Sequence, residues 1–194
     1  MPVPKSLLTV LLTALVAVSS PPAHAAPEDG HDAAKDVVSR DRFSDAPPRQ
    51  VEPSRRLGDV VRTQVTLGAD LVITTKLRSL TATGHQEFHW TVVTSADEEP
   101  GGWSGALVYN ADRRTYFTFL DPIAYDPECA RATVDRPART VTLTVPASCL
   151  GDPDWVRVGN GTLTLAGDRE YQDDARRAGI SLRGWKLGPK VTAS

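Results

Sequence analysis

Two histidines flank a glutamate in the segment His85–His89, which reads HQEFH. On a helix, two histidines at this spacing can bind zinc. Phe88 and Trp90 begin an alternation of apolar and polar residues, however, and a period of two is typical of a β-strand. Residues four apart on a strand lie about 13 Å from each other, which is too far for one metal ion. The segment therefore predicts polar side chains on a solvent-facing sheet surface and no metal site.

The segment Gly102–Ala106 (GWSGA) approaches the G-x-S-x-G pattern of a nucleophile elbow, which presents a reactive serine. The last glycine is missing, and the elbow requires a strand, a turn and a helix in an α/β sheet. The surrounding sequence has no such pattern. We therefore expect Trp103 to pack across the entry to a hairpin, and we predict no catalytic residue. A hydrolase that uses Ser104, with His85 or His89 as its base, is the third-ranked hypothesis.

Acidic residues gather in four predicted loops and could serve two kinds of chemistry. Paired carboxylates hydrolyse glycosides when they lie about 5–10 Å apart across a sugar, and carboxylate oxygens also bind calcium. Neither an EF-hand pattern nor a repeat-type calcium motif occurs in the sequence. We therefore expect solvated loop charges and predict no metal ligands, with calcium binding as an alternative. The four groups are Asp97–Glu99, Asp121–Glu128, Asp152–Asp154 and Asp168–Asp174.

Three aromatic residues, Trp103, Tyr125 and Trp155, lie in or beside predicted loops. An exposed aromatic ring can stack on the face of a sugar, although such rings more often cover the edge of a core. We select these three residues as candidates for ligand binding. Trp185 has a similar loop position, whereas Trp90 belongs to the apolar face of a predicted strand.

The first 25 residues have the order of a secretory signal peptide. Lys5 supplies a positive start, Ser6–Val18 is an uncharged apolar run, and Ala23–Ala25 (AHA) places small residues around a cleavage site. The apolar run is shorter than the roughly 20 residues that span a bilayer. We predict cleavage after Ala25 and a secreted, extracellular protein without a membrane span.

Cys129 and Cys149 are the two cysteines of the chain. Outside the cytoplasm an isolated pair of cysteines usually oxidises. A zinc site would require closer spacings such as C-x-x-C, which this sequence does not contain. We therefore predict a disulfide between Cys129 and Cys149.

The overall charge limits the classes of partner. The 194 residues include 22 Lys and Arg against 24 Asp and Glu, which gives a net charge of −2. A chain with this balance has no basic field with which to hold phosphates, so we predict no nucleic-acid partner.

The chain after the signal peptide divides into a leader and one domain. Residues 26–57 are rich in charge and proline, so we expect a mostly flexible leader. In residues 58–194, eight short runs alternate apolar and polar residues between turn signals, which predicts an antiparallel β-sandwich of jelly-roll or DOMON-like type. Gly159–Gly161 is expected to form a tight turn, and Glu170–Ala178 could form a short C-terminal helix. The eight runs are Val61–Leu67, Leu71–Arg78, Phe88–Val93, Leu107–Tyr109, Tyr116–Leu120, Thr140–Val145, Val156–Val158 and Leu163–Leu165.

Several segments of this predicted domain carry a resemblance to known sequences. A Thr/Val-rich strand precedes the segment Pro146–Arg157, which reads PASCLGDPDWVR. With three further segments, it resembles a group of uncharacterised secreted proteins of high-GC Gram-positive bacteria, for which no activity is implied. The further segments are Gly58–Arg62, Leu71–Leu80 and Asp173–Ala175.

The predicted strand order is also similar, more loosely, to the DOMON-like and family 9 carbohydrate-binding sandwiches. That resemblance implies a sugar or a haem as ligand. A Met/His-ligated haem requires a thioether, and Met1, the one methionine, lies in the predicted signal peptide. We therefore predict no cofactor.

The leading hypothesis is a secreted, non-catalytic module that binds a polysaccharide or another cell-envelope component. It combines the predicted export, the predicted stapled sandwich and the lack of a catalytic set in the sequence. The alternative is an extracellular protein–protein interaction module, such as an inhibitor or an accessory protein, acting through the Ser95–Gly102 loop or the leader.

Overall fold

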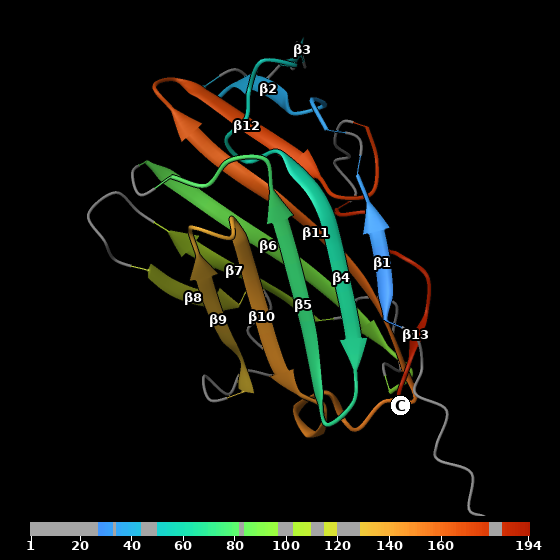
Figure 1. The fold of residues 1–194 in the computed structure, drawn as a ribbon. Helices are drawn as coiled ribbons and strands as arrows, with labels where there is room; N and C mark the ends of the chain where they lie inside the picture. The colour runs from blue at the N-terminus through green and yellow to red at the C-terminus, as the bar shows by residue number, and fades with distance from the viewer. Residues whose placement is uncertain are drawn as a thin grey trace, which may run out of the picture.

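The computed structural model describes residues 27–32, 34–43, 50–81, 84–96, 103–109, 115–119, 129–178 and 184–194. These residues form two antiparallel sheets that pack against each other, with the strands of one crossing those of the other at an angle (Figure 1). The predicted all-β sandwich with one disulfide is therefore confirmed. Within the described ranges we find no helix long and apolar enough to cross a membrane. The predicted signal peptide and its cleavage site at Ala25 lie outside the described residues.

The first sheet has five strands in the order β1-β4-β5-β10-β9. Its three central strands alternate between buried apolar and half-buried polar residues, which is the pattern of a sheet with one face on the core. The five strands are β1 (Glu28–His31), β4 (Val60–Leu67), β5 (Asp70–Leu77), β9 (Arg131–Asp135) and β10 (Thr140–Pro146).

The second sheet has eight strands, seven of them in the order β3-β2-β12-β11-β6-β7-β8, and the eighth, β13, pairs with β11. The long strands β6 and β11 form its centre and are paired over ten positions. The eight strands are β2 (Val38–Asp41), β3 (Gln50–Val51), β6 (His85–Thr94), β7 (Trp103–Tyr109), β8 (Thr115–Phe119), β11 (Trp155–Ala166), β12 (Arg169–Asp174) and β13 (Val191–Thr192).

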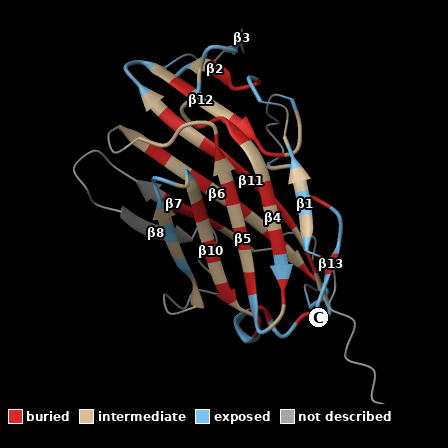
Figure 2. Cartoon of the chain, in the orientation of Figure 1, coloured by how far each residue is buried: buried red, intermediate tan, exposed pale blue. Residues whose placement is uncertain are grey.

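The hydrophobic core lies between the two sheets. Leu71 and Ile73 of β5 belong to the same buried cluster as Phe88 and Trp90 of β6, and each is at most 2% exposed. Figure 2 shows the alternation as buried bands along the central strands. A strand exposes successive side chains to opposite faces, so the same alternation sends the polar residues outward.

A buried amide joins the two sheets at one point of this core. The Asn160 side chain of β11 donates hydrogen bonds of 3.0 Å to the hydroxyls of Thr63 in β4 and Thr75 in β5. All three side chains are at most 2% exposed. Because each of these polar groups has a partner, the buried cluster is compatible with the apolar core around it.

The segment after β10 forms a corner that the predicted disulfide ties to Cys129. Cys149 lies in a short 3-10 turn, η2 (Ala147–Leu150), and its disulfide to Cys129 joins Cα atoms 5.7 Å apart. Gly151 then adopts a left-handed backbone with φ of 76°, which favours glycine, and the chain turns toward β11.

The tight turn predicted at Gly159–Gly161 is wrong, because these residues lie in the middle of the continuous strand β11. The glycines are needed for a different reason. A Cβ on Gly161 would collide with the Trp185 ring and the Asp173 carbonyl oxygen, and one on Gly159 would meet the backbone at Trp185. The C-terminal segment therefore crosses the face of β11 on which Gly159 and Gly161 leave no side chain.

The helix predicted over Glu170–Ala178 is also wrong. Residues Arg169–Asp174 form strand β12, which pairs with β11 on one side and with β2 on the other. Pairing on both sides satisfies the backbone of this segment, and tertiary context commonly overrides a weak local helix preference.

The described parts of the leader contribute to both sheets. Strand β1 pairs with β4 at the edge of the first sheet, and β2 and β3 extend the second sheet beyond β12. Val37 and Val38 are at most 5% exposed, so the leader also buries apolar side chains. The sequence indicated only a short edge strand near Asp36–Val38 in this region.

Candidate functional site

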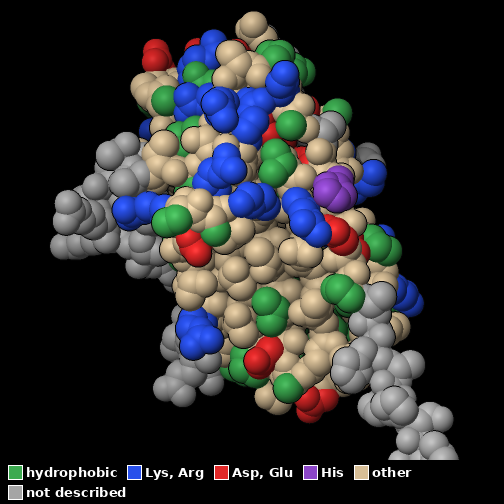
Figure 3. All heavy atoms as spheres, viewed as in Figure 1, with side chains coloured by type: hydrophobic (Ala, Val, Ile, Leu, Met, Phe, Trp, Pro, Cys, Tyr) green, Lys and Arg blue, Asp and Glu red, His purple; other side chains and the backbone are tan. Residues whose placement is uncertain are grey.

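The outer face of the five-stranded sheet contains a polar hollow of about 240 Å³. Strands β4, β5 and β10 supply its lining because their alternation sends every second side chain away from the core. Figure 3 shows that Lys and Arg side chains gather over the upper half of this face, whereas the lower half is mostly uncharged. The lining residues are Arg62, Gln64, Thr74, Lys76 and Thr140.

Both cations of this hollow are held by neighbouring groups. The Arg62 guanidinium donates two hydrogen bonds to the Asp29 carboxylate of β1, at 2.6 and 2.5 Å, and thereby lowers the pKa of Asp29. The Lys76 ammonium donates to the carbonyl of Ala138 in the β9–β10 turn. The hollow therefore contains the Arg62–Asp29 ion pair and the Lys76 ammonium beside one amide and two hydroxyl groups.

The aromatic candidates from the sequence lie elsewhere. Trp155 begins β11 on the eight-stranded sheet, is half-buried, and has the Lys190 ammonium 3.8 Å from its ring centroid. Trp103 begins β7 of the same sheet, where its backbone pairs with Val92. Since Val92 also pairs with Val158 in β11, the two tryptophan backbones lie near the same end of the sheet with β6 between them. The third candidate, Tyr125, and the side chain of Trp103 lie outside the described residues.

The histidine pair lies on the outer face of β6, as the strand pattern predicts. His85 Nε2 lies 2.5 Å from one carboxylate oxygen of Glu87, and His89 Nε2 lies 2.9 Å from the other. These hydrogen bonds, led by that from His89, lower the pKa of Glu87. The Trp185 ring lies 5.6 Å from the His89 ring, between centroids. The sequence correctly indicated polar residues here, but it did not show that Glu87 bridges both imidazoles.

The serine of the elbow-like segment is not bonded to either histidine. Ser104 lies in β7, and its hydroxyl shares a hydrogen bond of 3.2 Å with the Thr91 hydroxyl across the β6–β7 pair. The strand–turn–helix that an elbow needs is therefore replaced by a strand pair at this position.

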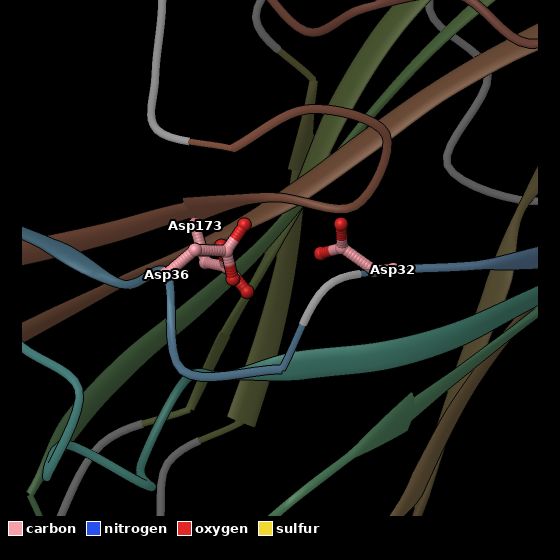
Figure 4. Close-up of side chains that lie close together, drawn as sticks. All are labelled: Asp32, Asp36 and Asp173. Atoms are coloured by element: carbon pink, nitrogen blue, oxygen red, sulfur yellow. The ribbon is translucent and has the colours of Figure 1, made fainter.

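A second polar cluster, which is partly buried, forms where Asp32, Asp36 and Asp173 converge (Figure 4). One oxygen from each carboxylate lies within 4.8 Å of the others. Asp32 directly follows β1, Asp36 precedes β2, and Asp173 lies in β12. Hard cations such as calcium prefer oxygen ligands of this kind, so these are the described residues that could hold a metal ion.

The hydrogen bonding of this cluster is incomplete. Asp173 is 0% exposed; one of its oxygens accepts a 2.7 Å hydrogen bond from the Val60 N–H, and the other has no partner among the described residues. Asp36 is 8% exposed, and both of its oxygens lack a hydrogen-bond partner there. Burial raises the pKa of Asp173 to about 9, with the charges of Asp32, Asp36 and Asp59 adding to the rise. Burial likewise raises the pKa of Asp36.

Two further buried carboxylates nearby differ because each has a cation. Asp59 lies 2.9 Å from the Arg78 guanidinium and accepts a hydrogen bond from the Lys35 N–H. Asp174 lies 2.6 Å from the Arg177 guanidinium and accepts from the Lys186 N–H. Among the described residues, no comparable ion pair with a cation is found for Asp36 or Asp173.

No prediction from the sequence included this cluster. The solvated loop predicted over Asp168–Asp174 is wrong for Asp173 and Asp174, since both are 0% exposed within β12. Asp36 next to Val37 and Val38 was the available signal, because an acid beside two apolar residues is drawn into the core with them.

A scan against protein families and a search of curated proteins both find no match to the sequence.

Proposed function

We propose that the protein is a non-catalytic binding module that acts outside the cell and holds an acidic carbohydrate of the cell envelope. The ligand lies on the outer face of the five-stranded sheet. The observation that carries this proposal is the hollow in which Arg62 and Lys76 stand beside Gln64, Thr74 and Thr140.

The residue types in the hollow match the groups of an acidic sugar. The Lys76 ammonium can pair with a carboxylate, sulfate or phosphate group, and Arg62, whose Nε and Nη2 are bonded to Asp29, can add a hydrogen bond from its remaining Nη1 group. Amide and hydroxyl groups donate to and accept from sugar hydroxyls. The five lining residues include no aromatic ring, so polar contacts carry the recognition at this face.

Two further observations support an extracellular binding role. The disulfide between Cys129 and Cys149 is compatible with an extracellular location, because disulfides persist in oxidising compartments. The signal-like first 25 residues point in the same direction. The β-sandwich is also an architecture on which sugar-binding modules are built, although one fold supports many functions.

Affinity electrophoresis with polygalacturonate in the gel, and with neutral pullulan as the comparison, tests the proposal. We expect polygalacturonate alone to retard the protein, and added salt to weaken the retardation. Lys76→Gln removes one partly screened charge contact of about 1 kcal/mol, which corresponds to about fivefold weaker binding. Arg42→Gln removes the same charge from an exposed turn that follows β2 of the other sheet, and this variant is expected to bind as the unchanged protein does.

Three results would contradict the proposal. Equal retardation by pullulan would remove the role of charge. Binding that survives Lys76→Gln but is lost on Trp155→Ala would move the site to the eight-stranded sheet. Absence of binding to either polymer, together with a protein recovered by crosslinking in culture medium, would favour the protein–protein alternative.

A further inference from the structure

We propose that Asp32, Asp36 and Asp173 bind one calcium ion, which ties the crossover between the two sheets to strand β12. This site is separate from the hollow on the five-stranded sheet and does not depend on the function proposed for it. Three carboxylates from three different elements converge there, with one oxygen of each within 4.8 Å of the other two.

Asp36 supplies a second observation that points to a ligand. The residue is 8% exposed, and neither carboxylate oxygen has a hydrogen-bond partner among the described residues. Figure 4 shows that its carboxylate faces the cluster. Asp173 adds one more buried oxygen without a partner. Buried polar groups in folded proteins are nearly always satisfied, so these oxygens indicate a bound group that completes the site.

The charges of the neighbourhood favour a cation as that group. Three arginines of this region, Arg78, Arg176 and Arg177, are paired with Asp59, Glu28 and Asp174. Asp36 and Asp173 have no ion pair of this kind within the described structure. Like charges at this separation repel one another in a buried setting, and a divalent cation would convert that repulsion into attraction.

The ligand type and the positions of the ligands select calcium. All candidate ligand atoms are carboxylate oxygens, which suit hard cations and not zinc or copper. Two of the three ligands flank a connection between strands, and calcium accepts the flexible, irregular geometry that such ligands give. Magnesium requires near-octahedral geometry and gives up its water reluctantly.

The position of the site explains what the ion would do. Strand β1 belongs to the five-stranded sheet and β2 to the eight-stranded sheet, so the residues between them cross from one sheet to the other. Asp32 and Asp36 lie at the two ends of this crossover, and Asp173 lies in β12, which pairs with β2. A bound ion would therefore fasten the crossover to a central part of the second sheet.

The test measures thermal unfolding of the disulfide-bonded protein after removal of metal with EDTA and exchange into metal-free buffer. For a dissociation constant of about 0.1 mM, 10 mM calcium is a hundredfold excess. That excess raises the melting temperature of a domain of this size by about 5–10 °C. Isothermal titration calorimetry on the same sample should show one site per chain, and 10 mM magnesium should have a smaller effect.

Matched variants separate this site from general effects of calcium. Asp36→Asn and Asp173→Asn preserve the shape of the side chain and remove one ligand charge, so the calcium-dependent rise in melting temperature should fall below about 2 °C. Asp154→Asn makes the same change at an exposed acidic position and should keep the full rise. If both buried variants fail to fold, Asp32→Asn, at a half-buried position, should show the same loss.

Four results would overturn the proposal. The first is that calcium neither raises the melting temperature nor gives a heat of binding, and the second is that the rise in melting temperature persists in both Asp36→Asn and Asp173→Asn. The third is that Asp154→Asn loses the rise to the same extent as the cluster variants. The fourth is that magnesium raises the melting temperature more than calcium does. Polysaccharide binding in EDTA tests the hollow on the five-stranded sheet and not the calcium site, because the two proposals are independent.

Discussion

Asp173→Asn should change how the stability of the metal-free protein depends on pH. The carboxyl is 0% exposed, and its pKa rises from 3.8 to about 9 on folding. Between these two values the folded state keeps a proton that the unfolded state has released. The free energy of unfolding therefore decreases as pH rises through this range, by about 1.4 kcal/mol per pH unit.

The magnitude at pH 7 follows from the same two pKa values. At pH 7 the carboxyl of the unfolded chain is about three pH units above its pKa and is ionised, whereas the carboxyl of the folded protein keeps its proton. This difference stabilises the unfolded state by about 4 kcal/mol, which the folded protein loses in stability. Asparagine cannot ionise, so the variant escapes this loss. Its amide oxygen can still accept the hydrogen bond from the Val60 N–H, and its NH₂ group can donate toward the neighbouring carboxylates.

Urea unfolding followed by tryptophan fluorescence in EDTA, at pH 5, 6, 7 and 8, measures this difference. We expect the unfolding free energy of Asp173→Asn to fall less steeply with pH than that of the unchanged protein. The two slopes should differ by about 1.4 kcal/mol per pH unit, which is the contribution of one proton. Asp154→Asn, at an exposed site, should remain parallel to the unchanged protein. Parallel curves for Asp173→Asn and the unchanged protein would refute the assignment of a raised pKa to this group.

Three further changes test the fold. Gly161→Ala should lower the unfolding free energy by about 1–3 kcal/mol because its Cβ would overlap the Trp185 ring, whereas Gly68→Ala, whose nearest neighbouring atom is 3.7 Å away, should have little effect in the same urea titration. Asn160→Ala should cost about 1–3 kcal/mol for each buried threonine hydroxyl left unpaired, which thermal unfolding can compare with Thr142→Val on the half-buried outer face; equal losses would argue against the bridge between the sheets. The double variant Cys129→Ser/Cys149→Ser should lose about 3 kcal/mol, while a thiol assay on the unfolded but unreduced protein should detect no free cysteine; two free thiols would contradict the disulfide.

The strands of the central sheet regions could be predicted because their signal is local. In β10 the alternation of Val141, Leu143 and Val145 with threonines corresponds directly to the buried and half-buried faces. The corner at Cys149 was similarly accessible, since a strand-ending proline, a cysteine and a glycine turn lie within a few residues. For such elements, periodicity and turn chemistry act over the same distance as the structure they specify.

The errors arise where distant residues decide the outcome. Gly159 and Gly161 have the local pattern of a turn, and only the passage of Trp185 over β11 explains why glycines occur within a strand. Strand β12 has a helix-like composition, and its pairing with both β11 and β2 decides its conformation. The spacing of residue types along the chain therefore could not predict either the role of these glycines or the conformation of β12.

The candidate sites likewise combine features that local sequence determines with features that depend on distant residues. The outward direction of Arg62 and Lys76 follows from strand alternation, but their shared hollow depends on which strands are neighbours. The aspartate cluster brings the leader together with β12, across most of the length of the domain. No spacing rule connects such positions, so the cluster becomes visible only when the strand order is known.

The division of β1 and β2 between the two sheets also affects how the molecule would respond to a cut in its backbone. Cleavage between residues 32 and 36 would leave β1 without its covalent link to β2, held by its pairing with β4 and by the ion pair of Glu28 with Arg176. Its departure would expose an open edge on β4, and unpaired strand edges attract extended peptides and further copies of the same chain. Limited proteolysis at this single connection would thus turn a closed sandwich into one that is prone to edge-to-edge assembly.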